Sequence, residues 1–210
     1  MQPISVTVGA VAANDQLVAA SQNVVAATSL TLTAGAASLS YPAQLVLTAS
    51  ANFTGVTFTV VGTGPAGQIQ TETLAGPNTT TVNSVLYYKS VTSITSDGGV
   101  AGGAIKVGST GLTSTRWVRF DSFASPVTAV QVDASGTVNF TVQTTMDDPN
   151  DPFSAPAVTA VNWVSDANFT SKAATTTGSF SATPTFARVI QNSGTGSATA
   201  RFAQFGNATY

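Results

Sequence analysis

The sequence predicts an all-β protein made of two small antiparallel β-sandwich or barrel-like modules. Short runs rich in Val, Ile, Thr and aromatic residues recur along the chain, separated by clusters of Gly, Pro, Asn, Asp and Ser. Several runs alternate between apolar and polar residues, which is the period of a half-buried strand. With 210 residues the chain can bury one large β core or two small ones, and the Gly, Ser and Thr-rich segment 107–115 favours two.

The predicted strands follow one another at short intervals. In chain order they lie at 4–8, 29–33, 44–49, 56–61, 68–74, 87–95, 127–132, 137–144, 187–192 and 198–205. Alternation is clearest in VTFTV (56–60) and VNFTV (138–142), which predicts two core strands. Their inward positions are Val56, Phe58, Val60, Val138, Phe140 and Val142, and their outward positions are Thr57, Thr59, Asn139 and Thr141.

Module boundaries follow from the same pattern. Because RWVRF starts a new apolar strand after the 107–115 segment, we expect the first β-sandwich module at 29–112 and the second at 113–210. Residues 1–28 carry a single charged side chain, Asp15, and show little periodicity. This segment is therefore expected to be an extended N-terminal arm that adds a strand to the sheet edge of a partner.

Composition argues against several classes of function. Only 8% of residues are charged, against roughly 25% in ordinary soluble domains. The formal net charge of −2 opposes a nucleic-acid-binding surface, and no apolar run reaches the ~18 to 20 residues of a membrane span. Without Cys or His the chain has no disulfide, thiolate metal site or Ser-His-Asp triad. The first basic residue is Lys89, so the start lacks the positive region of a secretory signal, and we expect a protein that stays in the cytosol or joins a larger particle.

The stretch TFTVVGTGPAGQIQTE has the G-x-G-x-x-G spacing of a dinucleotide-binding loop, at Gly62, Gly64 and Gly67. Such a loop opens a helix whose first amides hold the pyrophosphate. Here the following QIQTETL alternates like a strand, and Pro65 removes an amide donor from the loop. The three glycines therefore predict the solvent-facing tip of a β-hairpin with no ligand beneath it.

The loop MDDPNDP gathers Asp147, Asp148 and Asp151 with Asn150, and clustered oxygen ligands suit calcium. The spacing lacks the alternation and the glutamate of an EF-hand, and its two prolines favour a rigid solvated connection. The three aspartates are thus weak candidates for metal ligands, and no cofactor is expected. Since no pair among the nine acidic residues stands out as a catalytic acid and base, we predict no catalytic residue and no enzymatic activity.

Aromatic and arginine residues near the second module give the candidate interface anchors Trp117, Arg119 and Trp163. In a strand, Trp117 and Arg119 share one face while Val118 and Phe120 share the other. One face of this strand is then core, and the other is either core or a cation-π or stacking surface.

Several stretches in order along nearly the whole chain resemble a family of tailed-bacteriophage virion proteins. They are DQLVAASQNVVAATSLTL, GVTFTVVGTGPAGQIQTETLAGPN followed by YKSVTSIT, GAIKVGSTG, SGTVNFTVQTTMDDPNDP and RVIQNSGTGSATARFAQFG. The resemblance implies a structural component of a phage particle, made in the host bacterial cytoplasm and without enzymatic activity. It assigns no functional residue.

The leading hypothesis is a capsid decoration or cement protein on the virion surface, with the major capsid protein and copies of itself, in a trimer for example, as partners. A tail, nozzle or fibre component is the structural alternative. A carbohydrate-binding module for host attachment is the alternative from another class, with Trp117, Trp163, Tyr87 and Tyr88 as its stacking platform. Neither nucleic acid nor membrane is an expected partner.

Overall fold

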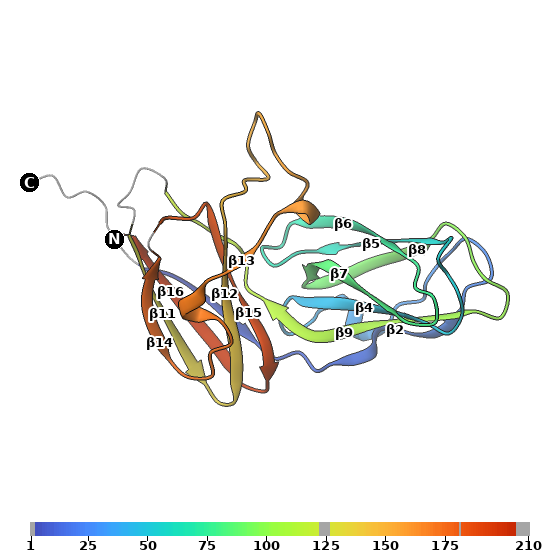
Figure 1. Cartoon of the computed structure of the whole chain (residues 1–210). Helices are drawn as coiled ribbons and strands as arrows, with labels where there is room; N and C mark the ends of the chain where they lie inside the picture. The colour runs from blue at the N-terminus through green and yellow to red at the C-terminus, as the bar shows by residue number, and fades with distance from the viewer. Residues whose placement is uncertain (1–2, 122–126, 181, 205–210) are drawn as a thin grey trace, which may run out of the picture. The chain divides into compact units, whose positions relative to one another are not determined.

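The computed structural model describes residues 3–121, 127–180 and 182–204, and it is all-β, as the sequence predicts (Figure 1). In these residues sixteen strands are joined by turns and by three short 3-10 helices. None of the helices described is long and apolar enough to cross a membrane.

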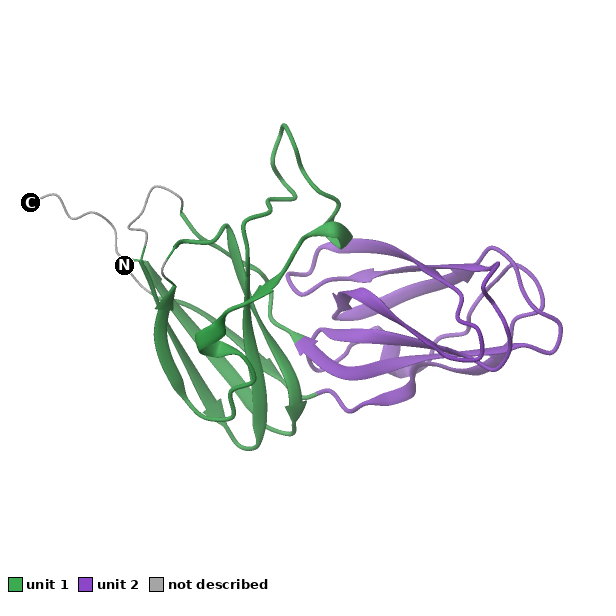
Figure 2. Cartoon of the chain, in the orientation of Figure 1, with its two compact units in different colours: residues 1–10, 114–210 green, residues 11–113 purple. Residues whose placement is uncertain are grey.

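Two compact units divide the chain, and Figure 2 colours them separately. Unit 1 consists of residues 1–10 and 114–210, and unit 2 consists of residues 11–113. The chain therefore passes between the units twice, after residue 10 and after residue 113. The second passage adjoins the division that the sequence places between 112 and 113.

Unit 2 is built from two antiparallel sheets. Its strands are β2 (Asn14–Asn23), β3 (Thr28–Ser29), β4 (Ala43–Ala49), β5 (Thr57–Thr63), β6 (Ile69–Ala75), β7 (Thr81–Tyr88), β8 (Ser90–Ser96) and β9 (Ala104–Ser114), with the 3-10 helix η1 at Ala34–Ala37. One sheet has the order β3-β8-β5-β6, and in the other β4 pairs with both β7 and β9 while β2 pairs with β9. The core between them includes Leu45, Leu47, Phe53, Phe58, Tyr88, Ile94 and Ile105.

Unit 1 has the same kind of construction with a different strand order. Its strands are β1 (Ile4–Gly9), β10 (Val118–Arg119), β11 (Thr128–Ser135), β12 (Val138–Thr145), β13 (Val164–Ser165), β14 (Thr176–Phe180), β15 (Phe186–Gly194) and β16 (Ser197–Gln204), with η2 at Val158–Ala160 and η3 at Ala167–Phe169. One sheet is β1-β16-β11-β14, and in the other β12 and β10 each pair with β15 while β13 pairs with β12. The core between them includes Val8, Val132, Phe140, Val142, Phe169, Phe180 and Phe202.

The predicted N-terminal arm is wrong in the part of it that the structure describes. β1 pairs with β16 in unit 1, and β2 pairs with β9 in unit 2. Val8 and Val18 are fully buried, one in each core. This segment is not free to add a strand to another protein, because its own side chains fill the two cores. Its low periodicity is consistent with the irregular pairing of β2 with β9, whose register shifts twice.

The two predicted core strands are confirmed, with one correction. All six predicted inward residues are buried, and Thr57 is exposed as expected. Thr141 in β12 is buried instead of facing outward. Its hydroxyl accepts hydrogen bonds from the Ser171 amide at 3.0 Å and from the Asn192 side chain at 2.9 Å. A threonine hydroxyl tolerates burial when it is bonded in this way, so alternation alone did not reveal that this strand is covered on both faces.

The β-hairpin prediction is confirmed. β5 and β6 pair antiparallel, and the Gly64 amide donates to the Gln68 carbonyl at 2.8 Å across the turn. Pro65 fits a type I turn, and Gly67 follows at φ +83°, the left-handed position of a three-residue hairpin loop. Gly62 has a different reason, since a Cβ there would lie 2.1 Å from the Ser90 carbonyl oxygen. The nucleotide-like spacing therefore combines a turn requirement with a close strand approach.

Candidate functional site

Exposed apolar side chains concentrate on one loop of unit 1. Of the nine large apolar side chains that are exposed among the described residues, four fall between residues 146 and 164: Met146, Phe153, Val158 and Val164. Phe153 is 96% exposed. These residues lie on or beside the long connection between β12 and β13, drawn in yellow and orange in Figure 1, which we call the β12–β13 loop (146–163). Apolar exposure of this density marks an interaction surface.

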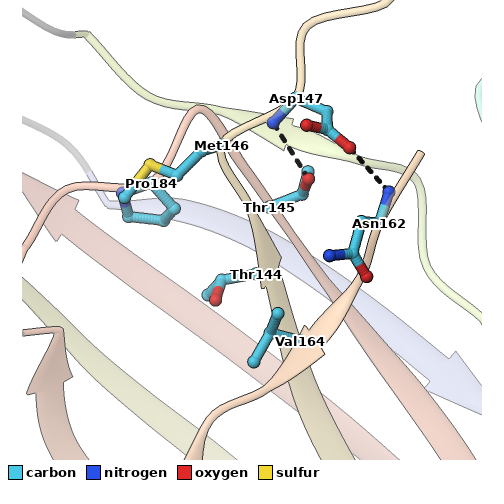
Figure 3. Close-up of a pocket in the computed structure, with 7 residues that line it drawn as sticks. All are labelled: Thr144, Thr145, Met146, Asp147, Asn162, Val164 and Pro184. Carbon is cyan, nitrogen blue, oxygen red and sulfur yellow. Dashed lines mark hydrogen bonds between the residues drawn. The ribbon is translucent and has the colours of Figure 1, made fainter. Parts of the chain in front are cut away.

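The neck of the β12–β13 loop is held by Asp147. Its amide donates to the Thr145 hydroxyl at 3.0 Å, and its carboxylate accepts from the Asn162 amide at 2.7 Å (Figure 3). Thr145 ends β12, and Asn162 lies two residues before β13. These two hydrogen bonds therefore join the beginning of the loop to its end.

Aspartate-based turns continue toward the tip of the loop. Asp148 accepts from the Asn150 amide at 2.9 Å, and its carbonyl accepts from the Asp151 amide at 3.0 Å. The carboxylate of Asp151 accepts from the Phe153 amide at 2.8 Å. Such side-chain to backbone bonds, together with the prolines that follow Asp148 and Asp151, restrict the backbone. Phe153 is thus presented from a restrained turn.

The three aspartates that the sequence offers as weak metal candidates have separate partners. Asp147 binds the Asn162 amide, Asp151 binds the Phe153 amide, and Asp148 forms an ion pair with Arg119 at 2.8 Å. In the described part of the chain no group of three His, Cys, Asp or Glu residues is placed to hold a metal ion. Each carboxylate acts on the local backbone or on an arginine.

A pocket of about 300 Å³ opens at the base of the loop, and we call it the loop-base pocket. It is lined by Thr144, Thr145, Met146, Asp147, Asn162, Val164 and Pro184 (Figure 3). Thr144 and Val164 face each other as cross-strand partners of β12 and β13. The walls combine apolar groups with hydroxyl, amide and carboxylate groups, so the pocket suits a mainly apolar group with a polar edge.

The predicted anchors Trp117, Arg119 and Trp163 are brought together in unit 1. The two tryptophan rings meet edge to face with their centroids 4.9 Å apart. Phe186 lies 5.7 Å from Trp117 on the same face, and the Arg119 guanidinium lies 5.5 Å from the Phe186 ring. Both tryptophans are half-buried, and in the strand Val118 and Phe120 point inward, as alternation predicts.

Arg188 completes this group but was not among the predicted anchors. Its guanidinium stacks over the Trp163 ring at 4.2 Å, and its Nε donates to the Gln143 side chain at 2.9 Å. Arginine over an aromatic face is favoured by electrostatic attraction to the ring. The tryptophans and arginines therefore first stabilise one another, and the loop beside them carries the exposed apolar residues.

The proposed carbohydrate-stacking platform is not formed as predicted. Tyr88 is fully buried in the core of unit 2, and Tyr87 is buried as well. The Tyr88 hydroxyl donates to Glu72 at 3.4 Å. A buried ring offers no face to a sugar, so Tyr87 and Tyr88 cannot act with Trp117 and Trp163 as a platform.

Glu72 is the one buried acidic side chain among the described residues. Its two carboxylate oxygens accept from the amides of Val85 at 2.6 Å and Leu86 at 3.2 Å, both on β7. Burial raises the pKa of Glu72 above its ordinary value, although these amides and the Tyr88 hydroxyl act against the shift. Burial and the nearby Glu72 charge in turn raise the pKa of Tyr88. The arrangement holds two strands together and is closed to solvent.

Sequence reasoning missed the loop-base pocket and the exposure of Phe153. One signal was available: a phenylalanine placed directly after two aspartate–proline turns, in a segment with no strand pattern, has no sheet to pack against. Val164, Pro184 and Arg188 gave no comparable signal, because their roles depend on pairing between distant strands. Comparison with protein-family models, with curated proteins and with solved structures finds no significant match to the chain.

Proposed function

We propose that this chain is a non-enzymatic structural protein of a bacteriophage virion that decorates the capsid and bridges neighbouring major capsid subunits. The ordered motifs that resemble phage virion proteins support this role over nearly the whole sequence. The two-unit β construction is compatible with a protein that spans a joint between capsid subunits.

The observation that carries the proposal is how the chain uses its acidic side chains. Among the described residues, a hydrogen bond to a backbone amide or an ion pair with a basic residue is formed by the carboxylates of Asp15, Glu72, Asp97, Asp133, Asp147, Asp148, Asp151 and Asp166. A catalytic acid is expected to combine an open cleft with a perturbed pKa, whereas Glu72, whose pKa is raised by burial, is closed to solvent. Here the carboxylates stabilise turns, strand edges and loop necks.

Two features of the chain suit an assembly that bears mechanical load: its low charge and the two covalent connections between its units. A surface of hydroxyl groups and small side chains can be buried against a partner without leaving charged groups buried and unpaired. Because the chain passes between its units twice, a force that separates them is shared by two covalent connections.

The proposal is tested with virions assembled without this protein. We expect particles that keep their tails but lose capsid integrity at a lower temperature, and we expect added purified protein to bind the heads and restore their stability. The same addition to tail-less heads provides the control for tail binding. Heads that bind none of the added protein would overturn the capsid role.

Two other outcomes would redirect the assignment. Intact heads that lack tails or fail to adsorb would indicate a tail, nozzle or fibre component. Retention of the purified protein on host polysaccharide, lost in Trp117→Ala and Trp163→Ala variants, would indicate a carbohydrate-binding role.

A further inference from the structure

We propose that the β12–β13 loop docks on a second copy of this chain, with Phe153 of each copy entering the loop-base pocket of the other. The inference concerns the isolated protein and does not depend on the capsid role. It follows from the exposure of Phe153, the volume of the pocket and the distribution of charge around them.

Phe153 is an apolar side chain that its own unit leaves uncovered. At 96% exposure nearly all of its surface meets water. A buried phenylalanine removes roughly 150–250 Å² from solvent, and aromatic anchors of this kind dominate interface energetics. Its backbone is held by Asp151, so little conformational freedom is left to lose when the ring is buried by a partner.

The loop-base pocket has room for that ring. Its volume is about 300 Å³, whereas an apolar cavity of roughly 150 Å³ already accepts benzene. Met146, Val164 and Pro184 supply apolar contacts, and Met146 and Val164 are themselves exposed in the single chain. A phenyl ring in the pocket would remove these apolar side chains from solvent, and they would remove the ring from solvent.

The positions of Phe153 and of the loop-base pocket favour a second copy of this chain as the molecule that fills the pocket. Phe153 lies on the loop, and the pocket lies at the base of the same loop. A two-fold axis perpendicular to the β12–β13 loop sets the loops of two copies antiparallel, and this arrangement directs the tip of each loop toward the base of the other. A two-fold interface requires this reciprocity, in which residue i contacts j and j contacts i.

Charge around the loop is also self-complementary. The β12–β13 loop contains three aspartates and no Lys or Arg. Arg119 lies beside the loop, where it pairs with Asp148, and its side chain remains 59% exposed. The exposed guanidinium of Arg119 can also face the aspartates of a second copy, whereas an acidic partner would place like charges against the loop.

The apolar area sets the expected affinity. Two buried phenylalanines account for roughly 300–500 Å², so Met146, Val158 and Val164 of both copies must also be covered to approach the roughly 1,200 Å² of a stable interface. We therefore expect a dimer that dissociates on dilution.

Sedimentation velocity over a wide range of protein concentration tests the proposal. The wild-type chain should approach twice its mass of 21.1 kDa at high concentration. Phe153→Ala should remain a monomer, with dimerisation about 1000-fold weaker because both sites are lost, at about 30-fold each. Ile69→Ala is the matched control, since Ile69 is 81% exposed on the hairpin of unit 2 and should leave dimerisation unchanged. Far-ultraviolet circular dichroism checks that each variant is folded.

Mixing two variants tests the pocket itself. Val164→Trp should fill the pocket and give a second monomeric variant, and Met146→Arg replaces it if the tryptophan disturbs folding. An equimolar mixture of the pocket variant with Phe153→Ala should form a heterodimer about 30-fold weaker than the wild-type dimer, because one Phe153 and one open pocket then meet. A wild-type monomer at all concentrations, a trimer or larger closed assembly, a dimer that survives Phe153→Ala, or folded variants that do not restore each other would each overturn the proposal.

Discussion

The two units close their sandwiches by different means. In unit 2, polar side chains of β6 bind the backbone of β7, a strand of the opposite sheet. Gln70 donates to the Tyr87 carbonyl at 2.8 Å, and Glu72 accepts from the amides of Val85 and Leu86. These bonds satisfy β7 edge groups that would otherwise be open to a further strand, so the edge is protected from pairing with another chain.

In unit 1, a cluster of aromatic rings packs in the core between the sheets. The rings of Phe120, Phe169, Phe180 and Phe202 form successive contacts with centroids 5.6–6.4 Å apart. The segment between β12 and β13 is left outside the core as a long loop. Polar contacts therefore make the closure of unit 2 sensitive to charge, whereas unit 1 has an apolar aromatic cluster in its core and carries exposed apolar side chains on the β12–β13 loop.

The largest expected effect is the loss of a central aromatic ring in either core. Phe58 and Phe140 are both fully buried, one in each unit. Phe58→Ala and Phe140→Ala should each lower the free energy of unfolding by about 3–5 kcal/mol, because each removes buried area and leaves a cavity. Chemical denaturation measures the change, and amide exchange shows which unit opens first. An effect below that of the exposed control Ile69→Ala would show that the core is wrongly placed.

Glu72→Ala should have the next largest effect. It leaves the amides of Val85 and Leu86 without an acceptor in a buried place, which costs about 2–4 kcal/mol. Glu72→Gln should cost less, since its carbonyl oxygen still accepts from one amide. Denaturation of the two variants side by side separates the hydrogen bonds from the charge. If Glu72→Gln loses as much stability as Glu72→Ala, the oxygen that glutamine keeps contributes nothing, and the carboxylate oxygen that it lacks carries the stabilisation.

The charge of Glu72 also predicts a pH dependence of stability that arises in unit 2. Its pKa is raised in the folded state, so on acidification the folded chain takes up a proton before the unfolded chain does. This contribution to stability is fully present below the ordinary pKa of 4.5 and is lost as pH rises through the higher folded value. The free energy of unfolding of the wild type, minus that of Glu72→Gln, should therefore rise as pH falls from neutral toward 4.5. A difference that falls over this interval would contradict the assignment.

The smallest effect is expected at the neck of the β12–β13 loop. Asp147→Ala removes the bond to the Asn162 amide at an exposed site, so global stability should change by less than about 1 kcal/mol. Amide exchange within residues 146–163 should nevertheless become faster, while exchange in β11 and β16 stays unchanged. Faster exchange throughout unit 1 would show that the loop supports the core instead of standing apart from it.

Local sequence pattern predicted the parts of the fold that depend on neighbouring residues. Alternation at 56–60 located a core strand because successive side chains of a strand point to opposite faces, and here the apolar ones all point to the same face. The hairpin at Gly64–Gln68 followed from the turn requirements of Pro65 and Gly67. The pairing of Trp117 with Arg119 on one face followed from the same period of two. The contact of Trp117 with Trp163 depended on the antiparallel pairing of β12 with both β13 and β15.

By itself, the sequence determined an all-β chain with little charge and no cysteine or histidine, because composition and short-range periodicity suffice for those conclusions. Only the tertiary structure decided that the first residues divide between two cores, that Glu72 binds the backbone of β7, and that a pocket opens at the base of the loop that carries Phe153. The reason is physical. These features arise where strands far apart in the sequence pair, and the side chain pattern of one strand does not specify which distant strand will lie next to it.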